Sequence, residues 1–159
     1  MVMTTPMTRG YSKTLMATVV VEPVVDASDE VVAACHRLIP QLSSSSRPIT
    51  IGELAEIVEG DSTVLFAARS DGEIVGLLTL AIFRIPTAVR AWIEDVVVDE
   101  RARGKGVGEA LNQAALAEAN RRGAKTVDLT SRPSREAANR LYQRIGFVRR
   151  DTNVYRFEW

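Results

Sequence analysis

The sequence predicts a single α/β domain, with a mixed, mostly antiparallel sheet of about seven strands flanked by about four helices. Its 159 residues suit one core, because domains commonly hold about 100 to 200 residues. Short β-branched apolar runs alternate with segments whose apolar residues recur at helical spacing. This order is typical of a sheet covered by helices.

The first part of the chain shows clear element signals. Strands are expected over 18–25, 63–70, 73–83 and 90–98, and helices over 26–42 and 50–60. The first helix has Ser28 as its expected N-cap and Pro40 as its expected end. Asp71 and Gly72 favour a tight hairpin, because both adopt left-handed backbone conformations readily.

The second part continues the pattern. A helix is expected from residue 107, a strand over 125–131, a helix over 134–147 capped by Ser134, and a terminal strand pair over 147–150 and 153–159. Residues 1–15 are polar and aperiodic and are expected to form a loose extension, so that the domain spans 16–159.

Composition excludes several classes of protein. Cys35 and His36 are the only cysteine and histidine, so we expect no internal disulfide and no metal site. No apolar run approaches the 18 or so residues of a membrane span, and the N-terminus lacks the features of a signal peptide. We therefore expect a cytoplasmic protein without a membrane partner.

Charge is unevenly distributed although the formal net charge is zero. Residues 1–100 hold 7 Lys and Arg against 14 Asp and Glu, and residues 101–159 hold 13 against 6. The two parts either neutralise one another or form ligand sites of opposite sign. The basic excess is modest and lacks interleaved aromatic residues, so a nucleic-acid partner is not expected.

The segment RARGKGVGEAL (101–111) joins an apolar strand to a helix, an arrangement that commonly binds an anion. A nucleotide P-loop does not fit, because Lys105 is followed by Gly106 rather than by Ser or Thr. A dinucleotide fingerprint does not fit either, because Glu109 occupies the place of its third glycine.

The pattern that remains is R-x-x-G-x-G, formed by Arg103, Gly106 and Gly108. Glycine allows main-chain NH groups to approach a diphosphate without a side-chain clash. Arg101, Arg103 and Lys105 would supply countercharge beside the helix N-terminus. The expected ligand is a pyrophosphate.

The stretch DVVVDERARGKGVGEAL resembles the acyl-CoA binding motif of the GNAT superfamily of N-acetyltransferases. The resemblance implies that the turn grips the pyrophosphate of coenzyme A, and that Val96, Val97 and Val98 bind the pantetheine arm through their main chain. The turn residues that it implicates are Arg103, Gly104, Lys105, Gly106, Val107 and Gly108.

The stretch EAANRLYQRIGF resembles the closing motif of the same superfamily, and the resemblance implies that Asn139 and Tyr142 meet the cofactor. The two residues are three positions apart and so share a helix face. Each alone also has an ordinary structural interpretation, Tyr142 as a buried anchor and Asn139 as a solvated side chain. Both motifs in the expected order favour the functional one.

The resemblance implies direct acetyl transfer from acetyl-CoA to a primary amine, with Tyr142 protonating the departing sulfur. Removing the amine proton needs a carboxylate or a water relay. Glu94 is the preferred base over Asp95, and at most one of the two should face the acceptor, because neighbouring strand residues point to opposite faces. The alternative is a non-catalytic acyl-CoA sensor of the same fold.

The acceptor is expected to be cationic, because acidic residues gather where the superfamily builds its acceptor wall. These residues are Glu53, Glu56, Glu59 and Asp61. A polyamine-like molecule, an aminoglycoside-like molecule and a protein amino group all remain open as acceptors. The apolar terminal strands suggest a homodimer.

Overall fold

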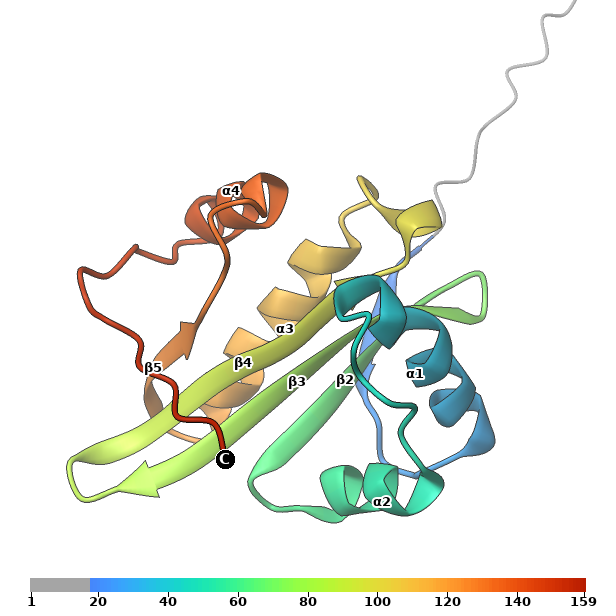
Figure 1. Cartoon of the computed structure of the whole chain (residues 1–159), viewed down its shortest axis with the longest axis horizontal. Helices are drawn as coiled ribbons and strands as arrows, with labels where there is room; N and C mark the ends of the chain where they lie inside the picture. Colours follow the sequence, from blue (N-terminus) through green and yellow to red (C-terminus); the bar gives the residue numbers. More distant parts are fainter. Residues whose placement is uncertain (1–17) are drawn as a thin grey trace, which may run out of the picture.

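The computed structural model describes residues 18–159, so the expected extension over 1–15 lies outside the described residues. Helices cover both faces of a sheet (Figure 1). The elements are β1 (Val20–Pro23), α1 (Asp29–Leu42), α2 (Ile51–Glu59), β2 (Thr63–Ser70), β3 (Glu73–Ile85), β4 (Ala88–Val98), a 3₁₀ turn (Glu100–Ala102), α3 (Val107–Arg121), β5 (Ala124–Leu129) and α4 (Glu136–Arg144).

The sheet follows chain order, β1-β2-β3-β4-β5. Strands β1 to β4 are antiparallel neighbours, whereas β5 runs parallel to β4. Helix α3 joins β4 to β5 and covers one face, while α1 and α2 cover the other (Figure 1). The predicted mixed α/β fold with four helices is confirmed, but the described sheet has five strands rather than about seven.

The sheet separates two apolar cores. Leu78 of β3 and Leu111 of α3 belong to the core on the α3 side, and Leu77 of β3 and Leu38 of α1 belong to the core on the α1 side. All four side chains are at most 2% exposed. Strand β3 contributes to both cores because its successive side chains point to opposite faces.

The tight hairpin is confirmed. Asp71 and Gly72 join β2 to β3 with φ angles of 51° and 82°. Positive φ at both positions is the geometry whose twist suits two-residue hairpins.

Strand β4 contains a bulge next to the expected site. Leu77 pairs with Val97 and Thr79 pairs with Glu94, so one β3 residue lies opposite two residues of β4. The first of these two, Asp95, has a φ of 50°. A bulge changes which side chains point to which face. Ile93 lies in the core on the α3 side, and Val97 lies in the core on the α1 side.

Two helix ends differ from the prediction. Helix α1 begins after the expected Ser28 cap but continues through Pro40 to Leu42. Pro40 has no NH to donate to the His36 carbonyl, so α1 lacks one hydrogen bond there, but the Ser43 NH donates to the Ile39 carbonyl at 2.9 Å and closes the last turn. Helix α4 begins after Arg135 rather than Ser134, because the Arg135 NH first closes a turn on the Arg132 carbonyl at 3.0 Å.

The predicted terminal strand pair is wrong for the described chain. Residues 147–159 form no strand, and the side chains of Tyr155, Phe157 and Trp159 are exposed. Their alternation is typical of a strand, but a strand also requires a partner edge, which a local pattern does not specify.

Candidate functional site

The glycine-rich turn reverses the chain between β4 and α3. Gly104 and Gly106 have φ angles of 75° and 80°, in the left-handed region. A Cβ atom would meet nothing within 4 Å at either position. Backbone conformation rather than crowding therefore explains these two glycines.

The main-chain NH groups of residues 104–109 donate to no acceptor among the residues that the structure describes. The first main-chain bond of the helix region runs from the Ala110 NH to the Gly106 carbonyl, at 3.0 Å. These free donors lie around the N-terminus of α3, where the helix dipole also favours negative charge. The turn can therefore bind an anion through its backbone alone.

Gly108 marks where three elements meet. A Cβ atom at Gly108 would lie 3.3 Å from the Leu141 side chain of α4 and 3.7 Å from the Val98 side chain of β4. The structure thus brings the end of β4, the first turn of α3 and the middle of α4 together, as both sequence motifs require.

Residues Val96 to Val98 lie beyond the point where β4 stops pairing with β5. The last pair in that register is Ile93 with Leu129. Val97 is buried at 4% exposure, and Val96 and Val98 pack against the core on the α3 side. Their side chains are thus committed to the cores, and only their main chain remains for a ligand. The same holds for Val107, which is 2% exposed.

The three cations of the motif have different environments. Lys105 is exposed and forms no ion pair with any described residue. The Arg103 guanidinium lies 3.8 Å from the Glu100 carboxylate, and more than half of the Arg103 side chain is exposed. Arg101 pairs with the buried Asp99 at 2.9 Å. Lys105 and Arg103 are therefore available to an anion, whereas Arg101 is already engaged by protein carboxylates.

Tyr142 is half-buried on α4. Its ring packs edge-on against Phe147, with 5.8 Å between the centroids. Burial raises the pKa of Tyr142 above 10.0, and the positive charge of Arg135 opposes this shift. The hydroxyl forms no hydrogen bond with any described residue, so it remains available as a proton donor.

Asn139 has a local structural partner. Its side-chain amide donates to the carbonyl of Arg132 at 2.9 Å. It therefore ties the connection between β5 and α4 to the helix that carries Tyr142. The amide oxygen has no described partner and is left for other contacts.

Glu94 lies on the sheet face covered by α1 and α2, because Ile93, directly before it on β4, points into the core on the α3 side and successive strand side chains alternate between faces. The carboxylate is exposed and accepts a hydrogen bond from the Trp92 indole NH at 2.7 Å. Asp95 is exposed as well. We expected Glu94 and Asp95 to point to opposite faces, but Asp95 lies in the bulge, which interrupts that alternation.

The acidic residues of the expected acceptor wall are dispersed. Glu53 closes the capping box at the start of α2 and pairs with Arg47, which lowers the pKa of Glu53 to about 2. Glu59 and Asp61 line a cavity of about 280 Å³ beside Arg122. No residue of the glycine-rich turn lines that cavity, nor a second cavity of about 400 Å³ at the C-terminal end of α3.

Two buried polar groups near the site were missed by sequence reasoning. Asp99, at 3% exposure, sits directly before the turn. The Ser131 hydroxyl is buried just after β5 and has no hydrogen-bond partner among residues 18–159. A polar residue directly after an apolar strand was the available signal, but such residues are common in loops, so the signal is weak.

Residues 18–159 contain neither a candidate metal centre nor a membrane-spanning helix. No group of three or more of their His, Cys, Asp and Glu side chains is placed to hold a metal ion. None of the four helices has both the length and the apolar character needed to cross a membrane.

Comparison with known proteins agrees with both motifs. The model of the acetyltransferase (GNAT) family matches residues 29–147. Mycothiol acetyltransferase from Paenarthrobacter aurescens (strain TC1) is 31% identical over 117 residues, which cover 72% of this chain and 36% of the relative. The chain spans less than half the length of the curated relatives that it matches.

Solved structures share the fold. A transcriptional regulator from Bacillus halodurans C-125 is 25% identical with a TM-score of 0.76, over 89% of this chain and 100% of the other. An acetyltransferase from Trypanosoma brucei is 26% identical with a TM-score of 0.71, over the same shares of the two chains.

Proposed function

Because the chain belongs to the acetyltransferase (GNAT) family, we propose that it is an N-acetyltransferase that moves an acetyl group from acetyl-CoA directly to a primary amine. The observation that carries the proposal is the set of main-chain NH groups at residues 104–109 that donate to no described acceptor. Free donors of this kind at a helix N-terminus are suited to a diphosphate, and coenzyme A carries one.

The donor is held mainly by the backbone. The free NH groups of the turn bind the diphosphate, with Arg103 and Lys105 as countercharge. The main chain of Val96 to Val98, unpaired on the β5 side, binds the pantetheine arm. Asn139 orients α4 beside the donor.

The protonated amine must lose one proton before it attacks and a second as the amide forms, and the departing sulfur must gain one. The second amine proton restores the phenol of Tyr142 after that phenol has protonated the sulfur. Bound acetyl-CoA supplies an acetyl group activated as a thioester. Tyr142 holds a proton on its phenol oxygen for the departing sulfur. Glu94 accepts the proton of the attacking amine, directly or through water, since an amine of pKa about 10.4 is almost fully protonated at neutral pH.

The acceptor is a cationic amine. Glu94 and Asp95 are both exposed at the bulge, so they place negative charge where the amine approaches. A polyamine-like molecule, an aminoglycoside-like molecule and a protein amino group all carry the required charge. The relative named mycothiol acetyltransferase supports acetyl transfer but does not choose among these acceptors.

The alternative function is a non-catalytic acyl-CoA sensor. A solved structure with the same fold, from Bacillus halodurans, is named a transcriptional regulator. This name supports a sensor as the second candidate function. A sensor needs the diphosphate turn but not Tyr142 or Glu94.

Titration calorimetry with acetyl-CoA tests the donor, and a thiol-release assay over a panel of amines tests the reaction. We expect saturable binding and amine-dependent release of coenzyme A. Binding without turnover on any amine would favour the sensor. Absence of heat at millimolar acetyl-CoA would refute both functions.

A further inference from the structure

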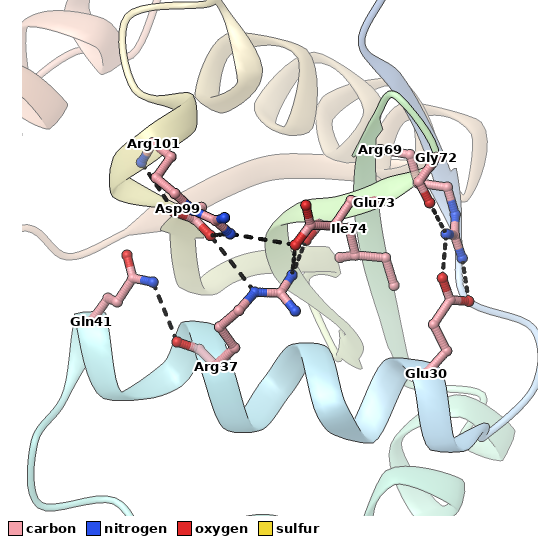
Figure 2. A network of polar contacts seen from close by, with 9 residues as sticks. All are labelled: Glu30, Arg37, Gln41, Arg69, Gly72, Glu73, Ile74, Asp99 and Arg101. Atoms are coloured by element: carbon pink, nitrogen blue, oxygen red, sulfur yellow. Dashed lines mark hydrogen bonds and ion pairs between the residues drawn. The ribbon is translucent and has the colours of Figure 1, made fainter.

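A buried carboxylate lies directly before the glycine-rich turn (Figure 2). Asp99 is 3% exposed. One of its oxygens accepts a hydrogen bond from the Arg101 guanidinium at 2.9 Å and lies 3.7 Å from Nε of Arg37. The other oxygen accepts from the main-chain NH of Arg101 at 3.0 Å.

The main chain of Asp99 is fixed as well. Its NH donates to the carbonyl of Val75 at 2.8 Å, which ties it to β3. Its carbonyl accepts from the NH of Ala102 at 2.8 Å, which closes the short 3₁₀ turn. A single residue therefore connects the end of β4, strand β3 and the start of the turn.

Two side chains of helix α1, Arg37 and Gln41, also lie beside Asp99 (Figure 2). The Arg37 guanidinium donates to the carbonyl of Ile74 and lies 3.4 Å from the Glu73 carboxylate. One turn further along, the Gln41 side-chain oxygen accepts from the NH of Glu100 at 3.0 Å. Through these two side chains α1 contacts Asp99, the residue after it and the start of β3.

Stability alone is a weak explanation for this arrangement. Removing a carboxylate from water is costly, and a buried ion pair often adds little net stability compared with apolar residues of the same size. The arrangement does, however, restrain the residues immediately before the NH groups that remain free. A ligand binds more tightly to donors that are already held in place.

We propose that Asp99 is a positioning residue for donor binding: with Arg37 and Arg101 it holds the start of the turn so that the NH groups of residues 104–109 are aligned before the diphosphate arrives. The inference rests on the proposed function. Asp99 acts through the backbone and does not touch the donor.

Asp99 is ionised throughout the neutral range. Its hydrogen bonds with the Arg101 side chain and main-chain NH, helped by the positive charge of Arg37, hold its pKa at about 2 against the opposing effect of burial. The charged groups around it are Arg37, Arg101 and Glu73. Donor affinity should therefore show no change from Asp99 titration between about pH 5 and 8.

The test compares Asp99→Asn with Glu30→Gln. Asparagine keeps the size of Asp99 but loses its charge. Glu30 is the control, since it lies on α1, the helix that also carries Arg37, and its more exposed ion pair with Arg69, at 2.6 Å, contacts the β2–β3 hairpin rather than the turn (Figure 2). Calorimetry with coenzyme A should show affinity lowered about tenfold in Asp99→Asn and unchanged in Glu30→Gln.

A positioning role also predicts how the kinetics divide. Asp99→Asn should raise KM for acetyl-CoA while kcat at saturating acetyl-CoA stays close to that of the wild type. Faster amide hydrogen exchange at residues 99, 101 and 102, whose NH groups are hydrogen-bonded around Asp99, should accompany the change without ligand. Residual structure is checked by thermal unfolding of each variant.

The outcomes separate this inference from the proposed function. If the wild type binds coenzyme A and Asp99→Asn binds equally well, the inference is wrong while the proposed function stands. If the wild type does not bind, both are wrong. Should Asp99→Asn fail to fold, Arg37→Gln replaces it, and unchanged affinity in that folded variant would overturn the inference.

Discussion

Tyr142 combines the features needed by a proton donor. Its hydroxyl has no described partner, its ring is fixed against Phe147, and burial raises its pKa above 10.0. The phenol therefore stays protonated at neutral pH. A thiolate whose acid has a pKa near 8.5 is a weaker base than phenolate, so the phenol donates its proton as the bond from carbon to sulfur breaks and negative charge builds on the sulfur.

Tyr142→Phe should lower kcat by about 100-fold or more, because a positioned general acid typically contributes a factor of about 10² to 10⁴. Affinity for coenzyme A should be unchanged, since only the hydroxyl is removed. Steady-state kinetics and calorimetry measure the two effects. Tyr155→Phe, in the exposed C-terminal segment, is the control and should alter neither. Lost binding in Tyr142→Phe would make the tyrosine structural.

Arg101 differs from the other two cations of the motif in its contacts. The sequence places Arg101, Arg103 and Lys105 in one basic segment, and all three were expected to face the anion. In the structure Arg101 is paired with Asp99 and Glu73. Of these three cations, Arg103 and Lys105 are the ones that we propose for the diphosphate.

At the scale of elements, the turn and the first residues of α3 form the anion site that we propose. Gly106 is the N-cap of α3 in the left-handed conformation and provides no side-chain cap. A side chain that capped the helix would occupy the NH groups that the ligand needs. The absence of a capping hydrogen bond is thus consistent with a helix that is completed by its ligand.

Gly106→Ala should weaken coenzyme A binding, and Gly123→Ala should not. Both glycines have similar left-handed φ angles, 80° and 76°, and a Cβ atom added to either would meet no other atom within 4 Å. Each substitution should therefore lower the free energy of unfolding by about 1 to 2 kcal/mol. Gly123 follows α3 at its far end, so chemical denaturation should find two similar losses and calorimetry only one binding defect.

The bulge in β4 is the second element-level feature that shapes the candidate site. By shifting the alternation after Ile93 it turns the side chains of Val96 and Val98 toward the core on the α3 side. The strand then offers its main chain where β5 no longer pairs with it. The two exposed carboxylates and the backbone that we propose for donor binding therefore lie within a few residues of one another on a single strand.

At the scale of the whole molecule, the C-terminal segment is the least buried part of the described chain. Four large apolar side chains after residue 153 are at least 73% exposed: Val154, Tyr155, Phe157 and Trp159. Apolar surface of this kind usually marks a contact with a partner. We propose a second copy of the chain as that partner, in keeping with the homodimer suggested by the sequence.

The double variant Phe157→Ser, Trp159→Ser should convert a homodimer into a monomer, because these two rings pack edge-on 5.2 Å apart and form the largest apolar group of the segment. Sedimentation equilibrium measures the mass. Val25→Ser, at an exposed valine outside this segment, is the control and should leave the mass unchanged. A wild-type monomer would contradict the proposal.

Much of the fold could be predicted because its signals are local. Ser28 caps α1, Asp71 and Gly72 close a hairpin, and apolar periodicity places all four helices. The turn and the α4 motif were found in the same way, since their residue types and spacing are sufficient to describe them. The absence of a strand over residues 153–159 was not predictable, because an alternating pattern does not specify a partner strand.

The sequence by itself determined the α/β class, the order of the elements as far as α4 and the glycine-rich turn between β4 and α3, since backbone conformation and periodicity depend on near neighbours. The tertiary structure alone decided that Arg101 is occupied by Asp99, that Glu94 lies on the face of α1 and α2, and that the last residues are unpaired. Those outcomes depend on distances between residues far apart in the chain, and short-range patterns carry no information about such distances.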